Sequence, residues 1–301
     1  MQIKKLEELF DILRGREKKR LTVAWAVDAH TVEAVNKAVE LGLVYATLVG
    51  DENTIREVCR EQNIDPDKFE LINVENDMKA AAAAVKLINE GKGNMLMKGN
   101  LSTDKYMKAI LNKENGLMDQ GAVLSHVTVM EIPSYHKLLV AGDAAIIPLP
   151  ELKQKVAITN YLINTARAIG IEKPKVALLA ATEQPSPNMP ACTDAAIISK
   201  MAERGQIKNA VVDGPLALDP AVDKESAAIK GIKSEVAGDA DCILFPNIES
   251  GNIFYKANAK LAGGEQGAIV AGARVPVVLS SRGDTSRTKL YSIALAAITA
   301  K

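Results

Sequence analysis

Ser281, Arg282 and Gly283 form the combination in this 301-residue chain that is best suited to phosphate chemistry, and they follow an apolar run that begins at Val277. Ser281 can donate a hydrogen bond to an oxyanion, Arg282 offers a planar fork of donors that matches phosphate, and Gly283 lets a ligand approach the backbone. An ordinary strand–turn–helix with an exposed arginine has the same pattern. The two interpretations stand about equal on pattern alone.

A second polar segment, Phe245 to Lys256, packs amides and hydroxyls into a predicted helix start after another apolar run. Such groups suit a phosphate or a pantetheine arm, but a plain N-cap with loop asparagines has the same composition. The candidate substrate contacts in this segment are Asn247, Ser250, Gly251, Asn252 and Lys256.

A third segment begins at Lys98, which ends a predicted strand. Thr103 or Asp104 is expected to cap the helix that follows, and Lys108 lies about one turn into it. Lys108 is placed to reach an anion, although a solvated lysine is the more common outcome. The candidate contacts here are Lys98, Asn100, Ser102, Thr103 and Lys108.

A fourth segment contains Asp213, which is predicted to end a strand before the Gly214-Pro215 turn. Its carboxylate is a candidate cleft residue, or simply part of a turn. The three histidines are scattered, and His126 is the best placed of them.

Short apolar runs alternate with helical patterns, which predicts an α/β fold with largely parallel sheets. The predicted strands are Leu21–Val27, Tyr45–Val49, Phe69–Val74, Asn94–Met97, Ala122–Ile132, Lys175–Ala180, Asn209–Asp213, Asp241–Phe245 and Val275–Ser280. The predicted helices include Thr31–Leu41, Asp77–Asn89, Leu152–Ile169 and Leu290–Ala300. Two domains are expected: residues 1–135 plus 273–301, and residues 136–272, with the first border at a proline turn.

Composition excludes several classes of protein. Lys plus Arg equals Asp plus Glu at 37 each, and no basic stripe is visible, so nucleic acid is not an expected partner. Three cysteines without a CxxC pair predict core residues and no zinc site. No apolar run is long enough to span a membrane, so a cytoplasmic protein is expected. Dinucleotide-fingerprint, Walker A, HExxH and GxSxG motifs are absent from the sequence.

Together the four segments resemble the phosphate acetyl/butyryl transferase family. The matching pieces are Lys98–Leu111, Asp213–Asp223, Phe245–Lys256 and Ser281–Ala300, in that order. The similarity spans most of the chain and is greatest to the clostridial phosphate butyryltransferases, which have about this length. Four ordered motifs at family-like spacing are more specific than any one of them.

The resemblance implies reversible acyl transfer between coenzyme A (CoA) and phosphate, with butanoyl-CoA as the substrate. It implies a fold like that of the isocitrate and isopropylmalate dehydrogenases, with the active site between the domains and at least a homodimer. Ser281 then assists the transition state, Arg282 binds phosphate, and Lys108 replaces an arginine of the acetyltransferases. We expect no metal and no cofactor beyond the substrates.

One family position departs from the pattern. The acetyltransferases have an aspartate that deprotonates the CoA thiol seven residues after the motif serine, and here that residue is Thr288. Asp284 or Asp213 is therefore a substitute candidate. Other possibilities are an acetyl-specific transferase, a metal- and NAD-dependent decarboxylating dehydrogenase on the same fold, and a non-catalytic CoA-binding protein.

Overall fold

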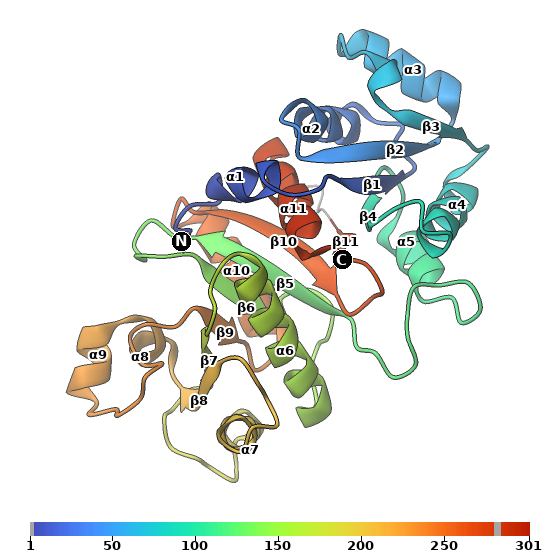
Figure 1. The fold of residues 1–301 in the computed structure, drawn as a ribbon. Coiled ribbons are helices and arrows are strands. Elements are labelled where there is room, and N and C mark those ends of the chain that lie inside the picture. The colour runs from blue at the N-terminus through green and yellow to red at the C-terminus, as the bar shows by residue number, and fades with distance from the viewer. Residues whose placement is uncertain (1–2, 280–283) are drawn as a thin grey trace. The chain divides into compact units, whose positions relative to one another are not determined.

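The computed structural model describes residues 3–279 and 284–301, which form two compact units. The first unit comprises Glu7–Ala122 and Gly267–Lys301, and the second comprises Val123–Gln266 and the N-terminal residues up to Leu6. Strands and helices alternate along both units (Figure 1), which confirms the predicted two-domain α/β architecture.

The first unit has the strand order β3-β2-β1-β4-β11-β10. All are parallel to their neighbours except β10, which runs antiparallel to β11. Because β1 leads to β2 on one side and borders β4 on the other, the topological switch point lies between β1 and β4. The strands are β1 (Lys19–Ala24), β2 (Val44–Gly50), β3 (Glu70–Asn73), β4 (Met95–Lys98), β10 (Glu265–Ala271) and β11 (Val277–Val278).

The helices of the first unit start at polar N-caps. Asp28, Asp51, Asn76 and Ser102 each accept a hydrogen bond from a backbone N–H three residues later. Helix α11 contacts α1 and α2, while α4 contacts α5. The helices are α1 (Glu8–Arg14), α2 (Ala29–Glu40), α3 (Glu52–Glu61), the 3-10 turn η1 (Pro66–Lys68), α4 (Asp77–Asn89), α5 (Thr103–Ile110) and α11 (Ser286–Thr299).

The second unit has the strand order β5-β6-β9-β7-β8, in which only β5 runs antiparallel to its neighbour. We call the edge where β6, β9 and β7 end the carboxyl edge, and the opposite one the amino edge. The strands are β5 (Ser125–Glu131), β6 (Leu139–Gly142), β7 (Lys175–Leu179), β8 (Val211–Leu216) and β9 (Cys242–Leu244). The helices are α6 (Leu152–Ala168), α7 (Pro190–Glu203), α8 (Leu218–Val222), α9 (Lys224–Ile229) and α10 (Ile248–Lys260).

The chain passes from one compact unit to the other at residues 122/123 and 266/267. The borders predicted from the sequence were 135/136 and 272/273. The turn at Pro133 connects β5 to β6, whose antiparallel pairing keeps both strands in the second unit. The cysteines behave as predicted: Cys59, Cys192 and Cys242 are all free and buried.

Candidate active site

The predicted phosphate segment Ser281, Arg282 and Gly283 lies outside the described residues, so its role stays a prediction. The structure describes the chain on either side of it. On one side β11 ends at Val278, in register with the end of β4. On the other, Thr285 caps α11 by accepting a 3.1 Å hydrogen bond from a backbone N–H of the first turn.

The loop after β4 lies against the loop after β1, at the switch point of the first unit. The Asn100 backbone N–H donates to the Trp25 carbonyl oxygen at 2.9 Å. A Cβ on Gly99 would lie 2.3 Å from that oxygen, so this close approach requires glycine. Lys98 Nζ donates to the carbonyls of Gly99 and Leu101 at 3.1 and 2.9 Å. These bonds hold the Lys98 ammonium at the carboxyl end of β4.

The cap of α5 differs from the prediction. Ser102 is the N-cap, because its Oγ accepts a hydrogen bond from Lys105 N–H at 3.3 Å, whereas Thr103 and Asp104 already lie inside the helix. A helix start carries up to four N–H groups without an intrahelical partner, and the cap satisfies one of them. The start of α5, with the exposed Thr103 in it, therefore suits an anion.

Helix α5 is joined to the end of β11 through Tyr106. Its buried hydroxyl donates to the Val278 carbonyl oxygen at 3.4 Å, and burial raises the pKa of Tyr106 well above its ordinary value, so the hydroxyl stays protonated. Lys108 lies about 200° around the helix from Tyr106 and is exposed. The structure thus brings Lys98 beside the end of β11 but directs Lys108 away from it.

The chain from Asp284 onward bears on the identity of the thiol base. Asp284 is half-buried and directly precedes the cap Thr285. Thr288 is the third residue of α11, and its Oγ1 lies 3.0 Å from Thr285 Oγ1. The Thr288 hydroxyl is therefore engaged in the helix cap, and a threonine hydroxyl is too weak a base to deprotonate a thiol at neutral pH.

In the second unit, the polar side chains at the start of α10 are engaged in capping. Asn247 Oδ1 accepts from Ser250 N–H at 3.0 Å, and Ser250 Oγ donates to Asn247 at 2.8–2.9 Å. Ile248 N–H donates to the Pro148 carbonyl oxygen at 2.9 Å. Glu249 adds negative charge to the first turn. This arrangement suits a phosphate poorly, which favours the cap interpretation for Asn247 and Ser250.

The next residues of α10 pack on the loop after β6. A Cβ on Gly251 would lie 2.2 Å from the Asp143 carbonyl oxygen, and Asn252 Nδ2 donates to Ala144 O at 3.1 Å. The buried Asp143 carboxylate accepts three backbone N–H bonds of 2.7, 2.9 and 3.2 Å from its own loop. Gly251 and Asn252 therefore hold the carboxyl edge in shape, while Lys256 is exposed farther along the helix.

Asp213 does not end its strand, because β8 continues to Leu216, which pairs with Leu179 of β7. Its Oδ1 accepts a hydrogen bond from the adjacent Gly214 N–H at 2.8 Å. The carboxylate is half-buried within the strand, so the predicted strand end at Asp213 is wrong, while its role in a cleft stays a prediction.

Two residues at the carboxyl edge were not selected as site candidates from the sequence, His126 and Asp143. His126 is 6% exposed, and its Nδ1 is buried without a hydrogen-bond partner. The Tyr255 ring of α10 packs edge-to-face on it, with centroids 5.5 Å apart. Burial lowers the pKa of His126, although the Asp143 charge opposes this, so the imidazole is neutral at pH 7. The sequence offered one signal for this edge, because Asp143 is a polar residue directly after the apolar run 138–142.

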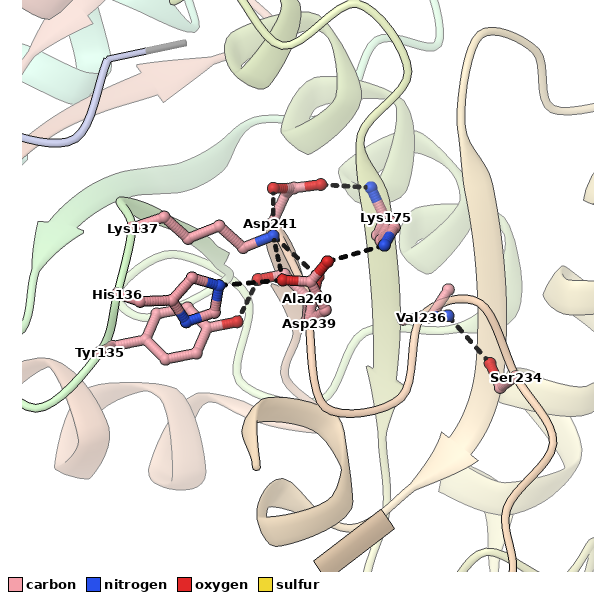
Figure 2. Close-up of polar contacts among 9 residues, drawn as sticks. All are labelled: Tyr135, His136, Lys137, Lys175, Ser234, Val236, Asp239, Ala240 and Asp241. Carbon is pink, nitrogen blue, oxygen red and sulfur yellow. Dashed lines mark hydrogen bonds and ion pairs between the residues drawn. The ribbon is translucent and has the colours of Figure 1, made fainter. Parts of the chain in front are cut away.

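The amino edge carries a network of charges (Figure 2). Lys137 Nζ lies 2.7 Å from Asp241 Oδ1 and 3.0 Å from Asp239 Oδ1. Asp239 Oδ2 contacts Lys175 Nζ at 2.7 Å, and Asp239 Oδ1 contacts His136 Nε2 at 2.9 Å. Burial alone raises the pKa of Asp239, but hydrogen bonds from Lys175 and Lys137 outweigh it and hold this pKa well below its usual range. All five side chains have partners within the network.

Neither a metal-binding cluster nor a membrane-spanning helix is present in the described ranges 3–279 and 284–301. No three His, Cys, Asp or Glu side chains gather there in a group that could hold a metal ion. No helix in those ranges has both the length and the apolar character needed to cross a membrane.

Known proteins similar to this chain agree with the sequence motifs. The family model for phosphate acetyl/butaryl transferase matches residues 4–84 and 77–297. The phosphate butyryltransferase of Clostridium acetobutylicum is 45% identical over 99% of both chains. The phosphate acetyltransferase of Thermotoga maritima is 41% identical over 97% of this chain and 99% of its own.

Solved structures show the same architecture. A branched-chain phosphotransacylase from Enterococcus faecalis superposes with a TM-score of 0.81 at 28% identity, covering 93% of this chain and 98% of its own. A 4-hydroxythreonine-4-phosphate dehydrogenase from Klebsiella pneumoniae has a TM-score of 0.56 at 14% identity, covering 95% of this chain and 100% of its own. The second likeness concerns the fold alone. Since the family model and relatives above 40% identity cover nearly the whole chain, the protein belongs to the phosphate acetyl/butyryl transferase family.

Proposed function

We propose that this protein catalyses the reversible reaction of butanoyl-CoA with phosphate to give butanoyl phosphate and CoA. The observation that carries the proposal is the 45% identity to a phosphate butyryltransferase over 99% of both chains. A second phosphate butyryltransferase, from Clostridium beijerinckii, is 40% identical over 99% of this chain. Both relatives extend over both units, so the similarity includes every candidate segment.

The proposed chemistry is direct attack in a ternary complex. In the direction of CoA acylation, the CoA sulfur attacks the carbonyl carbon of butanoyl phosphate, the C–S bond forms, and the C–O bond to phosphate breaks. Ser281 stabilises the oxyanion, and Arg282 holds the phosphate. The reaction needs no acyl-enzyme, metal or added cofactor. Its acceleration comes from holding two anionic substrates in reacting geometry.

Other candidate residues have supporting roles in this proposal. Lys98, held beside the end of β11, is a better second cation for the phosphate than the outward-facing Lys108. Asn100 and the start of α5 at Thr103 offer further donors. We also propose that the protein acts in the cytoplasm as a homo-oligomer, at least a dimer.

The decisive experiment measures thiol release from butanoyl-CoA with and without phosphate. Phosphate-dependent release is expected. Arg282→Ala should raise the phosphate KM strongly and lower kcat with unchanged unfolding, whereas the exposed control Arg204→Ala should match the wild type. Wild-type kinetics in Arg282→Ala would remove Arg282 from the site.

Acetyl transfer is the second candidate, because a phosphate acetyltransferase is 41% identical over 97% of the chain. Kinetics across acetyl-, propionyl-, butanoyl- and valeryl-CoA separate the two. Each buried methylene is worth about 0.8 kcal/mol, so the preference should rise in steps from acetyl-CoA to butanoyl-CoA. The proposed function places its maximum at four carbons. A maximum at acetyl-CoA would reassign the substrate.

The dehydrogenase and binding-protein alternatives are tested alongside. A likeness at 14% identity to a dehydrogenase supports the fold only. Stabilisation against heat by NAD would favour a dehydrogenase. Binding of butanoyl-CoA without thiol release would favour a non-catalytic protein.

A further inference from the structure

His126 carries an unused nitrogen at an edge where ligands collect. It is the second residue of β5, and because β5 is antiparallel to β6, it lies where β6 ends. The carboxyl edge of an open α/β sheet is the usual place for ligands. His126 is 94% buried and its Nδ1 has no partner, which typically costs about 1–3 kcal/mol. A group that remains unsatisfied at such a position calls for a functional explanation.

The surroundings of His126 suit a proton acceptor. Tyr255 of α10 packs on the ring from one side, and the Asp143 carboxylate after β6 is the charged group that acts on it. Burial keeps the imidazole neutral at pH 7, and in the tautomer that carries its proton on Nε2 the Nδ1 lone pair can accept a proton. The Asp143 charge stabilises the imidazolium once a proton arrives. Asp143 itself cannot serve as the base so readily, because its oxygens accept three backbone N–H bonds.

Thr288, Asp213 and Asp28 are less suitable bases, and Asp284, which directly precedes the α11 cap Thr285, is the competing candidate. Thr288 is bonded into the α11 cap, and Asp213 accepts from Gly214 within β8. Asp28 of the first unit also has an unpartnered oxygen, Oδ2, while its Oδ1 caps α2. A carboxylate is in general a weaker base than an imidazole, so it is a poorer acceptor for a thiol proton.

We infer that Nδ1 of His126 accepts the proton of the CoA thiol, a role for which the Thr288 hydroxyl is unsuited. The inference rests on the proposed acyl transfer. The S–H proton passes to Nδ1, the sulfur attacks the butanoyl carbonyl carbon, and phosphate leaves with its C–O electron pair. The imidazolium then returns the proton to the phosphate, which restores neutral His126. Because the thiol is the terminal group of CoA, only this end of the substrate has to come against Nδ1.

The first test compares His126→Asn with His136→Asn. Asn keeps a polar atom near the Nδ1 position but has no basicity, and His136 is an exposed histidine at the opposite edge. With CoA and butanoyl phosphate, His126→Asn should lose about 100-fold or more in kcat. The rate of His126→Asn should then rise with pH until the free thiol ionises near its pKa of ~8.5. This rise should occur at a higher pH than the rise in the wild-type rate. His136→Asn should behave as the wild type.

The second test uses seleno-CoA, whose selenol is already ionised at neutral pH and needs no base. The loss in His126→Asn should largely disappear with this acceptor. An equal loss with CoA and seleno-CoA would mean that His126 only maintains structure and would overturn the inference. A loss confined to CoA in Asp28→Asn or Asp284→Asn, without one in His126→Asn, would also overturn it.

Folding and function are controlled separately. Circular dichroism and thermal unfolding accompany each variant, and His126→Gln replaces His126→Asn if the latter does not fold. A wild-type protein that forms no thioester contradicts the proposed function. An active wild type with an equally active, folded His126 variant contradicts this inference alone.

Discussion

The two edges of the second unit's sheet differ in whether their buried polar groups have hydrogen-bond partners. At the amino edge, the side chains of Lys137, Lys175, Asp239 and Asp241 satisfy one another (Figure 2). At the carboxyl edge, Nδ1 of His126 is buried without a partner.

The difference separates a structural role from a functional one. A satisfied ion network positions strands, and it has no capacity left for a ligand. A buried nitrogen without a hydrogen-bond partner lowers stability and calls for an explanation, such as a functional role. Variants at the two edges should therefore differ in whether they lose stability or activity.

Lys137→Met should destabilise the protein most. Lys137 is buried and contacts both Asp239 and Asp241, so its loss removes the ammonium group that faces the buried Asp241 carboxylate. Removing one partner of a buried pair typically costs about 3–5 kcal/mol. Denaturant unfolding measures this, with the less buried Lys175→Met as the milder control. Folded Lys137→Met should retain wild-type KM values, and a changed KM would mean that the amino edge takes part in binding.

Gly251→Ala should disturb the carboxyl edge. The added Cβ would lie 2.2 Å from the Asp143 carbonyl oxygen, which forces α10 and the loop after β6 apart. Overpacking of this kind costs about 1–3 kcal/mol, and here it should also reduce kcat. At the control position, Gly15, a new Cβ meets only one backbone oxygen at 3.8 Å. Equal activity in the two variants would show that this packing is not needed for catalysis.

Asn252→Ala removes a single hydrogen bond between α10 and the loop after β6. Its Nδ2 donates to Ala144 O at 3.1 Å, and such a bond contributes about 0.5–1.5 kcal/mol. Unfolding free energies should show this loss, while Ile253→Ala, at a 68% exposed neighbour, should show almost none. If Asn252→Ala instead weakens CoA binding with full stability, the side chain contacts substrate as the sequence suggested.

Much of the fold followed from local patterns. Helix α4 has the predicted bounds Asp77–Asn89, and the nine predicted strands all correspond to observed ones. The strands β6 and β10 were not predicted, because Leu139–Gly142 is short and Glu265–Ala271 begins with polar residues after two glycines. Tertiary pairing, which a local pattern does not contain, makes them strands.

The site was less predictable because many polar residues had two possible roles. Ser102 and Asn247 are strand-end residues suited to a ligand, and both proved to be N-caps. Asp213 was predicted at a strand end, whereas its strand runs three residues farther. His126 could not be distinguished from a core histidine until its burial and its lack of a partner were visible.

The smallest predicted effect is a difference in how acid acts on the two edges. The pKa of folded His126 is lowered by burial, so below ~6.5 the unfolded chain binds the proton more readily and stability falls. Asp239 has a lowered folded pKa, so its contribution is full above the unfolded value of ~3.9 and is lost as pH falls below it. Between pH 7 and 5, His126→Asn should therefore gain stability relative to the wild type, while Asp239→Asn should keep a constant deficit. Urea unfolding at intervals of half a pH unit measures both. Parallel wild-type and His126→Asn curves would show that His126 titrates normally in the folded protein, and the contrast between the two edges would then lose its electrostatic basis.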